Sequence, residues 1–250
     1  AGLASTLSDA RITDYLLQSD SNIEAIREFY DESFEEQFNR CFNEFLKKVP
    51  DMTGVTKTYL LPSMGFFKGR AIPVGDEIVL LLAIDELAKL KGVAFDSTIY
   101  HELFHVYNYQ ILPTAEKTAR RFFLEGVPPE LYKLLWFEGL ASYTTRVVDP
   151  RISNEDILNF EELRRRTEPI LPELIRILKQ DLKTNDITGF FGGTRKGHPQ
   201  VSGGCGYYLG LLVVEQVADG YPLQGLVRLE GESLFRQVDS ALQDILDRYE

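Results

Sequence analysis

The apolar positions of the chain recur mostly at helical spacing. Between residues 23 and 46 they fall every three or four positions and stop before Pro50, which predicts one long amphipathic helix. The same periodicity predicts four further helical regions. They cover about residues 98–110, 130–147, 207–218 and 231–248, with one or two charged helices between 154 and 182 that Pro169 and Pro172 interrupt.

Two short runs of apolar and β-branched residues depart from this helical pattern. Residues 55–61 and 78–84 are bounded by glycine and proline, and we predict that both are strands. A short helix or helical turn over 85–91 follows. The pair Asp96-Ser97 then offers N-cap side chains to the helix that starts at about residue 98. A small sheet is therefore expected before this helix.

Two segments lack a regular pattern. Residues 111–129 predict a mixture of helix and loop, and residues 189–206 contain seven glycines in eighteen positions, which predicts a loop. The chain has no internal repeat, and its length suits one domain over residues 1–250. We expect an α+β domain, mostly helical, with an N-terminal lobe of about residues 1–110 and a helical C-terminal lobe of about 111–250.

Composition and charge limit the partners. The chain is 44% hydrophobic and 26% charged, which excludes collagen-like, coiled-coil and disordered proteins. Its net charge is -11, and its densest basic cluster, Arg164 to Arg166, lies among glutamates. We therefore expect no nucleic-acid partner. No stretch approaches the roughly 18 consecutive apolar residues of a spanning helix, so we expect no membrane insertion.

The cysteines and the first residue bear on the compartment. Cys41 and Cys205 are too few for a disulfide framework or a cysteine-based zinc site, and they form either one disulfide or two buried thiols. The chain begins with Ala1, as a mature exported protein or a trimmed chain does. This favours a periplasmic or extracellular location over a cytoplasmic one.

The most informative motif is HELFH, residues 101–105. Residues i and i+4 share one face of a helix, so His101 and His105 can bind the same metal ion. Glu102 lies beside the first histidine, where its carboxylate can act as the general base toward a metal-activated water. The alternative is a pair of histidines satisfied by hydrogen bonds in the core. Because the chain has only three histidines, this spacing favours a zinc site.

A catalytic zinc ion usually has a third protein ligand. Ile111 stands where an extended motif would place a third histidine, so we expect a carboxylate. Glu138 lies in the apolar helical segment 134–141, where a buried carboxylate needs a partner such as a dication. Gly139 leaves room for the helix of the motif to approach. Glu125 is the alternative ligand, separated from the second histidine by nineteen residues, although it precedes a turn where glutamates are usually exposed.

HELFH followed by WFEGLASY (residues 136–143) and GYYLG (206–210) resembles the glutamate-zincin (gluzincin) metallopeptidases. The chain looks most similar to the poorly characterised predicted zinc-dependent proteases with HExxH, EGLA and GYxxG elements. The similarity covers about residues 96–146 and, more weakly, 200–218. It implies a zincin-like fold that holds one Zn2+ per chain and cleaves a peptide or protein substrate. By this resemblance the ligands are His101, His105 and Glu138, and the general base is Glu102.

The sequence departs from this family at one position. In the thermolysin branch an aspartate four residues beyond the glutamate ligand orients a ligand histidine, and here that position is Ser142. Ser142, Tyr143 or another residue has to orient the histidines instead.

Peptide hydrolysis also needs a donor to the developing oxyanion. Tyr207, the tyrosine of the GYxxG element, is the first candidate, with Tyr208 as its neighbour. His198 is a third candidate, because the glycine-rich loop that carries it could act as a mobile flap. The resemblance also suggests that residues 78–84 form an edge strand that pairs with extended substrate. The alternative is an ordinary buried strand.

These observations predict a zinc-dependent peptidase. Two other classes stay open. One is a non-catalytic, zinc-stabilised module with a zincin fold that binds a peptide or protein. The other is a metal-free helical interaction protein.

Overall fold

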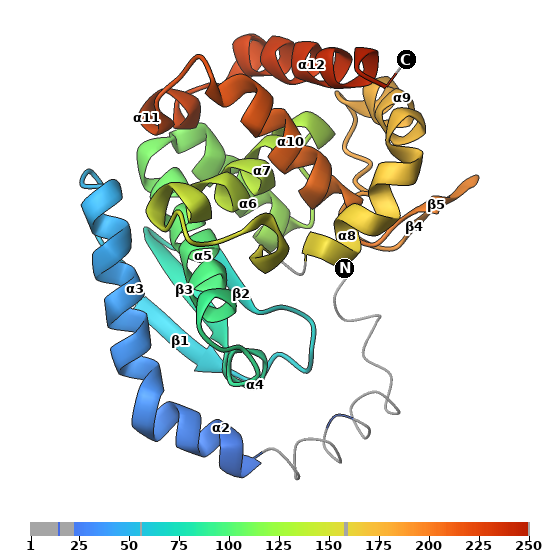
Figure 1. Ribbon diagram of the computed structural model, residues 1–250. Coiled ribbons are helices and arrows are strands. Elements are labelled where there is room, and N and C mark those ends of the chain that lie inside the picture. Colours follow the sequence, from blue (N-terminus) through green and yellow to red (C-terminus); the bar gives the residue numbers. More distant parts are fainter. Residues whose placement is uncertain (1–14, 16–22, 56, 158–159, 250) are drawn as a thin grey trace.

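The computed structural model describes residues 15, 23–55, 57–157 and 160–249. The fold is α+β, and about 63% of the described residues are helical, with a small mixed sheet beside the helices (Figure 1). The expectation of a mostly helical α+β protein is therefore confirmed. Among the helices in the described ranges, none combines the length and apolar character needed to cross a membrane.

The first described helical region contains a change of helix type. α2 (Ile23–Phe29) continues through the π-helical turn η1 (Tyr30–Phe34) into α3 (Glu35–Lys48). In a π-helix the backbone hydrogen bonds join residues i and i+5 rather than i and i+4. Phe29 and Phe34 therefore come to one face, with their ring centroids 5.9 Å apart. The sequence predicts one regular helix here because the apolar spacing does not reveal the wider turn.

The sheet has three strands in the order β1-β3-β2. β1 (Lys57–Leu61) pairs in parallel with β3 (Glu77–Ala83), and β2 (Gly69–Val74) pairs antiparallel with β3 through a tight turn. The expectation that residues 78–84 form an edge strand is wrong. β3 lies in the centre of the sheet, with Leu80 and Leu82 fully buried. The edge strands are β1 and β2, and β2 was not predicted from the sequence.

Helix α5 (Val93–Ile111) packs against the sheet and is buried along most of its length. It begins five residues earlier than predicted, after Gly92, whose φ is +54°. Asp96 is therefore not an N-cap residue. Its buried carboxylate accepts hydrogen bonds from the guanidinium of Arg40 on α3 and from the thiol of Cys41. A tertiary ion pair has replaced the local role that the sequence suggested.

Both cysteines are free, buried thiols, so the alternative of a disulfide between them is wrong. Burial raises the pKa of the Cys41 thiol well above its usual range, and the negative charge of Asp96 raises it further. Burial also raises the pKa of Cys205, to about 11. Both side chains serve as small core residues.

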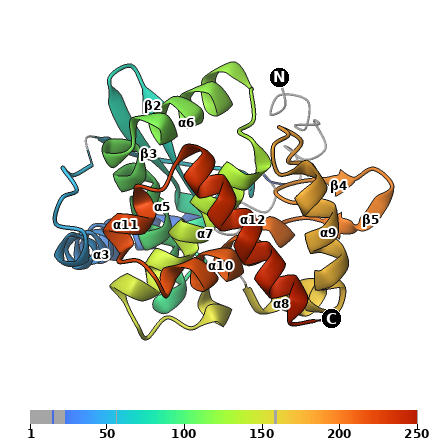
Figure 2. The same ribbon diagram turned by 90° about the horizontal axis from the view of Figure 1, so that it is seen from above.

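The segment between the two central helices is more regular than expected. Instead of a mixture of helix and loop, α6 (Pro113–Glu125) starts with a proline in its first turn and ends at Gly126, whose φ is +70°. Figure 2 shows α6 alongside β2, and the two elements are in contact. α6 therefore forms one side of the space above the edge of the sheet.

Helix α7 (Leu131–Val148) lies in the centre of the helices, where it packs mainly against α5 and α10 (Figures 1 and 2). The glycine-rich region contains a short hairpin rather than only loop. The remaining elements are α4 (Ile84–Leu87), η2 (Asn154–Asp156), α8 (Phe160–Thr167), η3 (Glu168–Ile170), α9 (Leu171–Asp181), β4 (Thr194–Arg195), β5 (His198–Ser202), α10 (Cys205–Ala218), α11 (Leu223–Val227) and α12 (Gly231–Asp247).

Helices α7 and α10 cross in close backbone contact. A Cβ atom added at Gly139 of α7 would lie 2.2 Å from the carbonyl oxygen of Gly210 on α10. The prediction that another helix approaches α7 closely at Gly139 is confirmed. The helix that approaches it there is α10, however, and not α5.

Candidate metal centre

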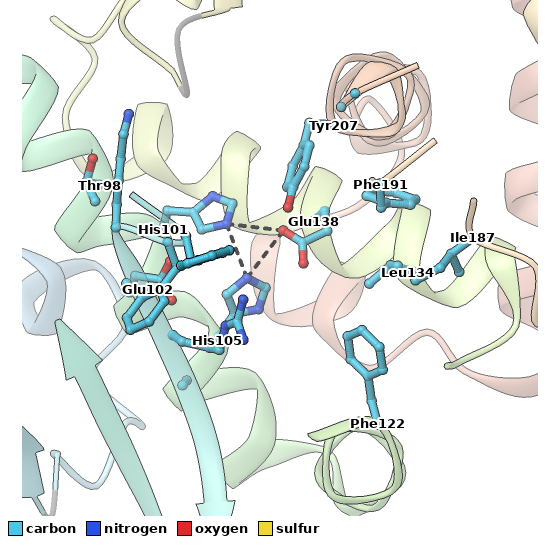
Figure 3. Close-up of a pocket in the computed structure, with 18 of the residues that line it drawn as sticks. Thr98, His101, Glu102, His105, Phe122, Leu134, Glu138, Ile187, Phe191 and Tyr207 are labelled. Atoms are coloured by element: carbon cyan, nitrogen blue, oxygen red, sulfur yellow. Dashed lines mark hydrogen bonds and ion pairs between the residues drawn. The ribbon is translucent and has the colours of Figure 1, made fainter. Parts of the chain in front are cut away.

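Helices α5 and α7 bring three potential ligand atoms to one point. His101 and His105 extend from successive turns of α5, and Glu138 faces them from α7 (Figure 3). The Nε2 atoms of the histidines are 3.2 Å apart, and Glu138 Oε2 lies 3.2 Å from His101 Nε2 and 3.6 Å from His105 Nε2. The structure thus brings together all three residues that the sequence analysis selected as ligands.

These separations fit a bound metal ion. Ligands at about 2.0–2.1 Å from a tetrahedral zinc ion are about 3.3 Å apart. Two imidazole nitrogens and a carboxylate oxygen form the donor set of a common type of catalytic zinc site. Both histidines are buried, with 4% and 7% of their surfaces exposed, and a dication offers all three donors a partner at once. The residues present therefore fit zinc.

The charges within this cluster are strongly coupled. Burial alone would raise the pKa of Glu138, but the charges and hydrogen bonds of the two histidines outweigh it and hold this pKa well below its usual range. Burial tends to lower the pKa of His105, yet the carboxylate of Glu138 raises it overall. Glu138 is thus held as a carboxylate, the form that binds cations.

Glu102 lies beside the cluster and is not one of its three members. Its side chain is buried, and burial raises its pKa, opposed by the nearby histidines. The edge strand leaves room for it at Gly69, where an added Cβ would lie 2.3 Å from Glu102 Cγ. The role of Gly69 could not be predicted from the sequence, because residues 69–74 lack the alternating pattern typical of a strand.

The structure separates the two adjacent tyrosines. Tyr207, in the first turn of α10, lines the same cavity, and its hydroxyl points toward the Glu138 carboxylate (Figure 3). The negative charge of Glu138, together with burial, raises the pKa of Tyr207 well above its usual range. Tyr208 instead donates a hydrogen bond to Glu168 at 3.0 Å. Of the two tyrosines, Tyr207 is therefore the one that faces the cluster, and its hydroxyl stays protonated and can donate a hydrogen bond.

Three other candidates lie away from the site. Glu125 ends α6 with 58% of its side chain exposed and faces Arg121 at 4.0 Å. His198 belongs to the hairpin strand β5 and does not line the cavity. The hydroxyl of Ser142 is buried, and neither it nor the Nδ1 atom of either histidine has a hydrogen-bond partner among the residues described. The expectation that Ser142 orients a histidine is therefore not met.

The cluster opens into a cavity of about 480 Å³ between the edge strand, α5, α6, α7, α8 and the segment that leads into α10. Aromatic and aliphatic side chains form much of its lining. The sequence analysis identified none of these positions: Phe66, Phe67, Phe122, Phe123, Leu134, Leu163, Ile187 and Phe191. Charged side chains also line it, including Arg70 of β2. Four of the apolar lining side chains are labelled in Figure 3: Phe122, Leu134, Ile187 and Phe191.

No protein-family model matches this chain, and neither the curated proteins nor the solved structures provide a match. The class of site therefore rests on the geometry of the chain itself. That geometry defines a buried candidate metal centre of two histidines and one glutamate, open to a cavity lined by both apolar and charged side chains.

Proposed function

We propose that this protein is a zinc-dependent peptidase with a zincin-like fold. The observation that carries the proposal is the convergence of His101, His105 and Glu138, with the unliganded carboxylate of Glu102 beside them. Zinc bound by these three residues would supply Lewis acidity and lower the pKa of a water molecule. The resemblance of HELFH and WFEGLASY to gluzincin motifs supports the same conclusion.

The residues of the chain have distinct roles in this proposal. Glu102 takes a proton from the attacking water and returns it to the amine that leaves when the peptide C–N bond breaks. Tyr207 donates a hydrogen bond to the carbonyl oxygen as negative charge develops on it. The aromatic side chains that line part of the cavity contact apolar substrate side chains. One zinc ion per chain and a peptide or protein substrate follow from this proposal.

The test compares matched Glu→Gln variants. Glu102→Gln is expected to retain one zinc ion per chain but to lose at least about 100-fold in the rate of cleavage of unfolded protein and peptide substrates, since it lacks the general base. Glu125→Gln is the control, because Glu125 is exposed and outside the cluster. Cleavage is followed by mass spectrometry before and after chelation. Full activity in Glu102→Gln would overturn the mechanism.

One observation favours a second candidate, a zinc-stabilised binding module without turnover. The Nδ1 atoms of both histidines lack hydrogen-bond partners among the residues described. In catalytic zinc sites, a hydrogen bond from this second nitrogen usually orients each histidine ligand. This alternative predicts bound zinc and a chelator-sensitive melting temperature, with no cleavage of protein, peptide or peptidoglycan-derived substrates. Saturable, chelator-sensitive cleavage would exclude it.

A further inference from the structure

Arg70 is an arginine of the edge strand β2 whose side chain lines the cavity of the metal centre. Its guanidinium carbon lies over two aromatic rings, 5.1 Å from the centroid of Phe67 and 5.5 Å from that of Phe123. Phe67 precedes β2, whereas Phe123 belongs to α6. The guanidinium is therefore held by contacts from two separate elements rather than extended into solvent.

No carboxylate among the residues described pairs with Arg70. Other partly buried arginines of this acidic chain have such partners: Arg146 pairs with Glu215, and Arg195 with Asp181. The aromatic rings contact the guanidinium through their faces and cannot accept its full set of N–H donors. A positioned guanidinium that lines a cavity and forms no salt bridge with a carboxylate of the described residues is suited to a carboxylate from a ligand, which it can bind through two parallel hydrogen bonds.

The position of Arg70 relates it to the candidate metal centre. The preceding residue of β2 is Gly69, where an added Cβ would contact the side chain of Glu102 at 2.3 Å. The guanidinium extends from this point toward Phe123 on α6, and the same cavity contains Glu138. A short peptide segment that reaches from the metal centre to Arg70 thus stays within one cavity, which aromatic and charged side chains line together.

We propose that Arg70 binds the free C-terminal carboxylate of the substrate, so that the protein acts as a peptidase at the C-termini of peptides. This inference rests on the proposed function, which it makes more specific. The terminal carboxylate forms hydrogen bonds with the guanidinium, and the terminal side chain packs on the nearby phenylalanines. The scissile bond then lies beside Glu102. Hydrolysis adds one water molecule across the C–N bond, which separates a short C-terminal fragment from the rest of the substrate. The carboxylate of this fragment stays bound to Arg70 until the product dissociates.

The first experiment measures cleavage of paired substrates by the full-length, zinc-loaded protein. N-acetylated peptides that end in phenylalanine are compared as free acids and as C-terminal amides, with kcat/KM obtained by mass spectrometry. We expect the acids to be preferred by about tenfold or more, the usual effect of a charge-assisted bidentate contact. In Arg70→Gln this preference of acids over amides falls to about one.

Two further variants make this result specific. Arg70→Lys retains the charge but not the forked donors, and it is expected to keep part of the preference. Arg121→Gln removes an exposed positive charge from α6 outside the cavity, and it should keep all of it. Equal cleavage of acids and amides by the unaltered protein would overturn the proposal. So would an equal loss for both substrates in Arg70→Gln when its melting temperature is unchanged.

A binding measurement separates this inference from the proposed function. Calorimetry with N-acetyl-L-phenylalanine and its amide is carried out on zinc-loaded Glu102→Gln, with and without Arg70→Gln. We expect about tenfold tighter binding of the acid, lost in the double variant. If the acid preference persists without Arg70, the carboxylate binds elsewhere and the inference fails. If the preference depends on Arg70 but no peptide is ever cleaved, the carboxylate site stands and the peptidase proposal fails.

Discussion

Replacement of Gly139 by alanine tests the close crossing of α7, which carries Glu138, with α10. A Cβ atom at this position would lie 2.2 Å from the carbonyl oxygen of Gly210 and 2.4 Å from its carbonyl carbon, whereas ordinary van der Waals contact begins at 3.4 Å. The obstructing atoms are backbone, so no change of rotamer relieves the overlap. α7 and α10 must therefore separate by about 1 Å at a closely packed crossing.

The expected loss of stability follows from two opposing effects. Overpacking of a core costs about 1–3 kcal/mol, and the upper end applies here because two backbones collide. Alanine is favoured over glycine in a helix interior by about 1 kcal/mol, which offsets part of this loss. We expect the free energy of unfolding to fall by about 2 kcal/mol, which lowers the melting temperature of a chain of this size by about 4–8 °C. Zinc affinity should fall too, because Glu138 precedes Gly139.

The assay is thermal unfolding followed by circular dichroism. Gly225→Ala in α11 is the matched control, since an added Cβ there meets only side-chain atoms at 3.5 Å or more. It should leave the melting temperature unchanged or raise it slightly, because it gains helix propensity without a collision. If Gly139→Ala melts at or above the temperature of the unaltered protein, the close crossing of α7 and α10 is refuted.

Three further predictions concern other parts of the fold. Gly69→Ala displaces the side chain of Glu102 and should lower peptidase activity at least about tenfold while zinc content, by elemental analysis, is retained; loss of zinc would contradict this. Asp85→Ala removes the acceptor of two backbone N–H groups in the loop before β2 and should destabilise the protein by about 1–3 kcal/mol, with faster hydrogen exchange of both amides; unchanged exchange would count against this role. Hydrogen bonds from Arg151 lower the pKa of Asp149, so this carboxylate stabilises the fold above its ordinary pKa and loses that effect as the pH falls through the lowered value. Asp149→Asn should therefore cost about 0.5–1 kcal/mol at pH 7, a small effect because Arg151 is exposed, and the difference in urea unfolding should shrink toward pH 3; a difference independent of pH would refute the assignment.

The sequence was most informative where a local pattern determines the structure. The spacing of His101 and His105 on a helix, and the apolar surroundings of Glu138, were sufficient to select the three residues that converge in the fold. Helices α7 and α12 begin and end within one residue of the ranges predicted for them. In these cases the burial of one continuous segment decides the outcome.

Features that depend on distant contacts were not predictable in this way. β2 contains Gly69, Arg70 and Pro73, which do not alternate as strand residues do, and an edge position tolerates its proline. Asp96 resembles an N-cap residue until Arg40, 56 positions earlier in the chain, provides its partner. Local spacing also could not decide which of two adjacent tyrosines faces the cluster, since that depends on the rotation of α10 relative to α7.

The most direct test of the account is the metal content of the protein purified without added zinc. Elemental analysis should find about one zinc ion per chain. This zinc should be lost in His101→Ala and retained in Glu125→Gln, which alters a glutamate outside the cluster. Absence of metal, even after incubation with zinc, would contradict the assignment of His101, His105 and Glu138 as a metal centre, and the peptidase proposal would fall with it.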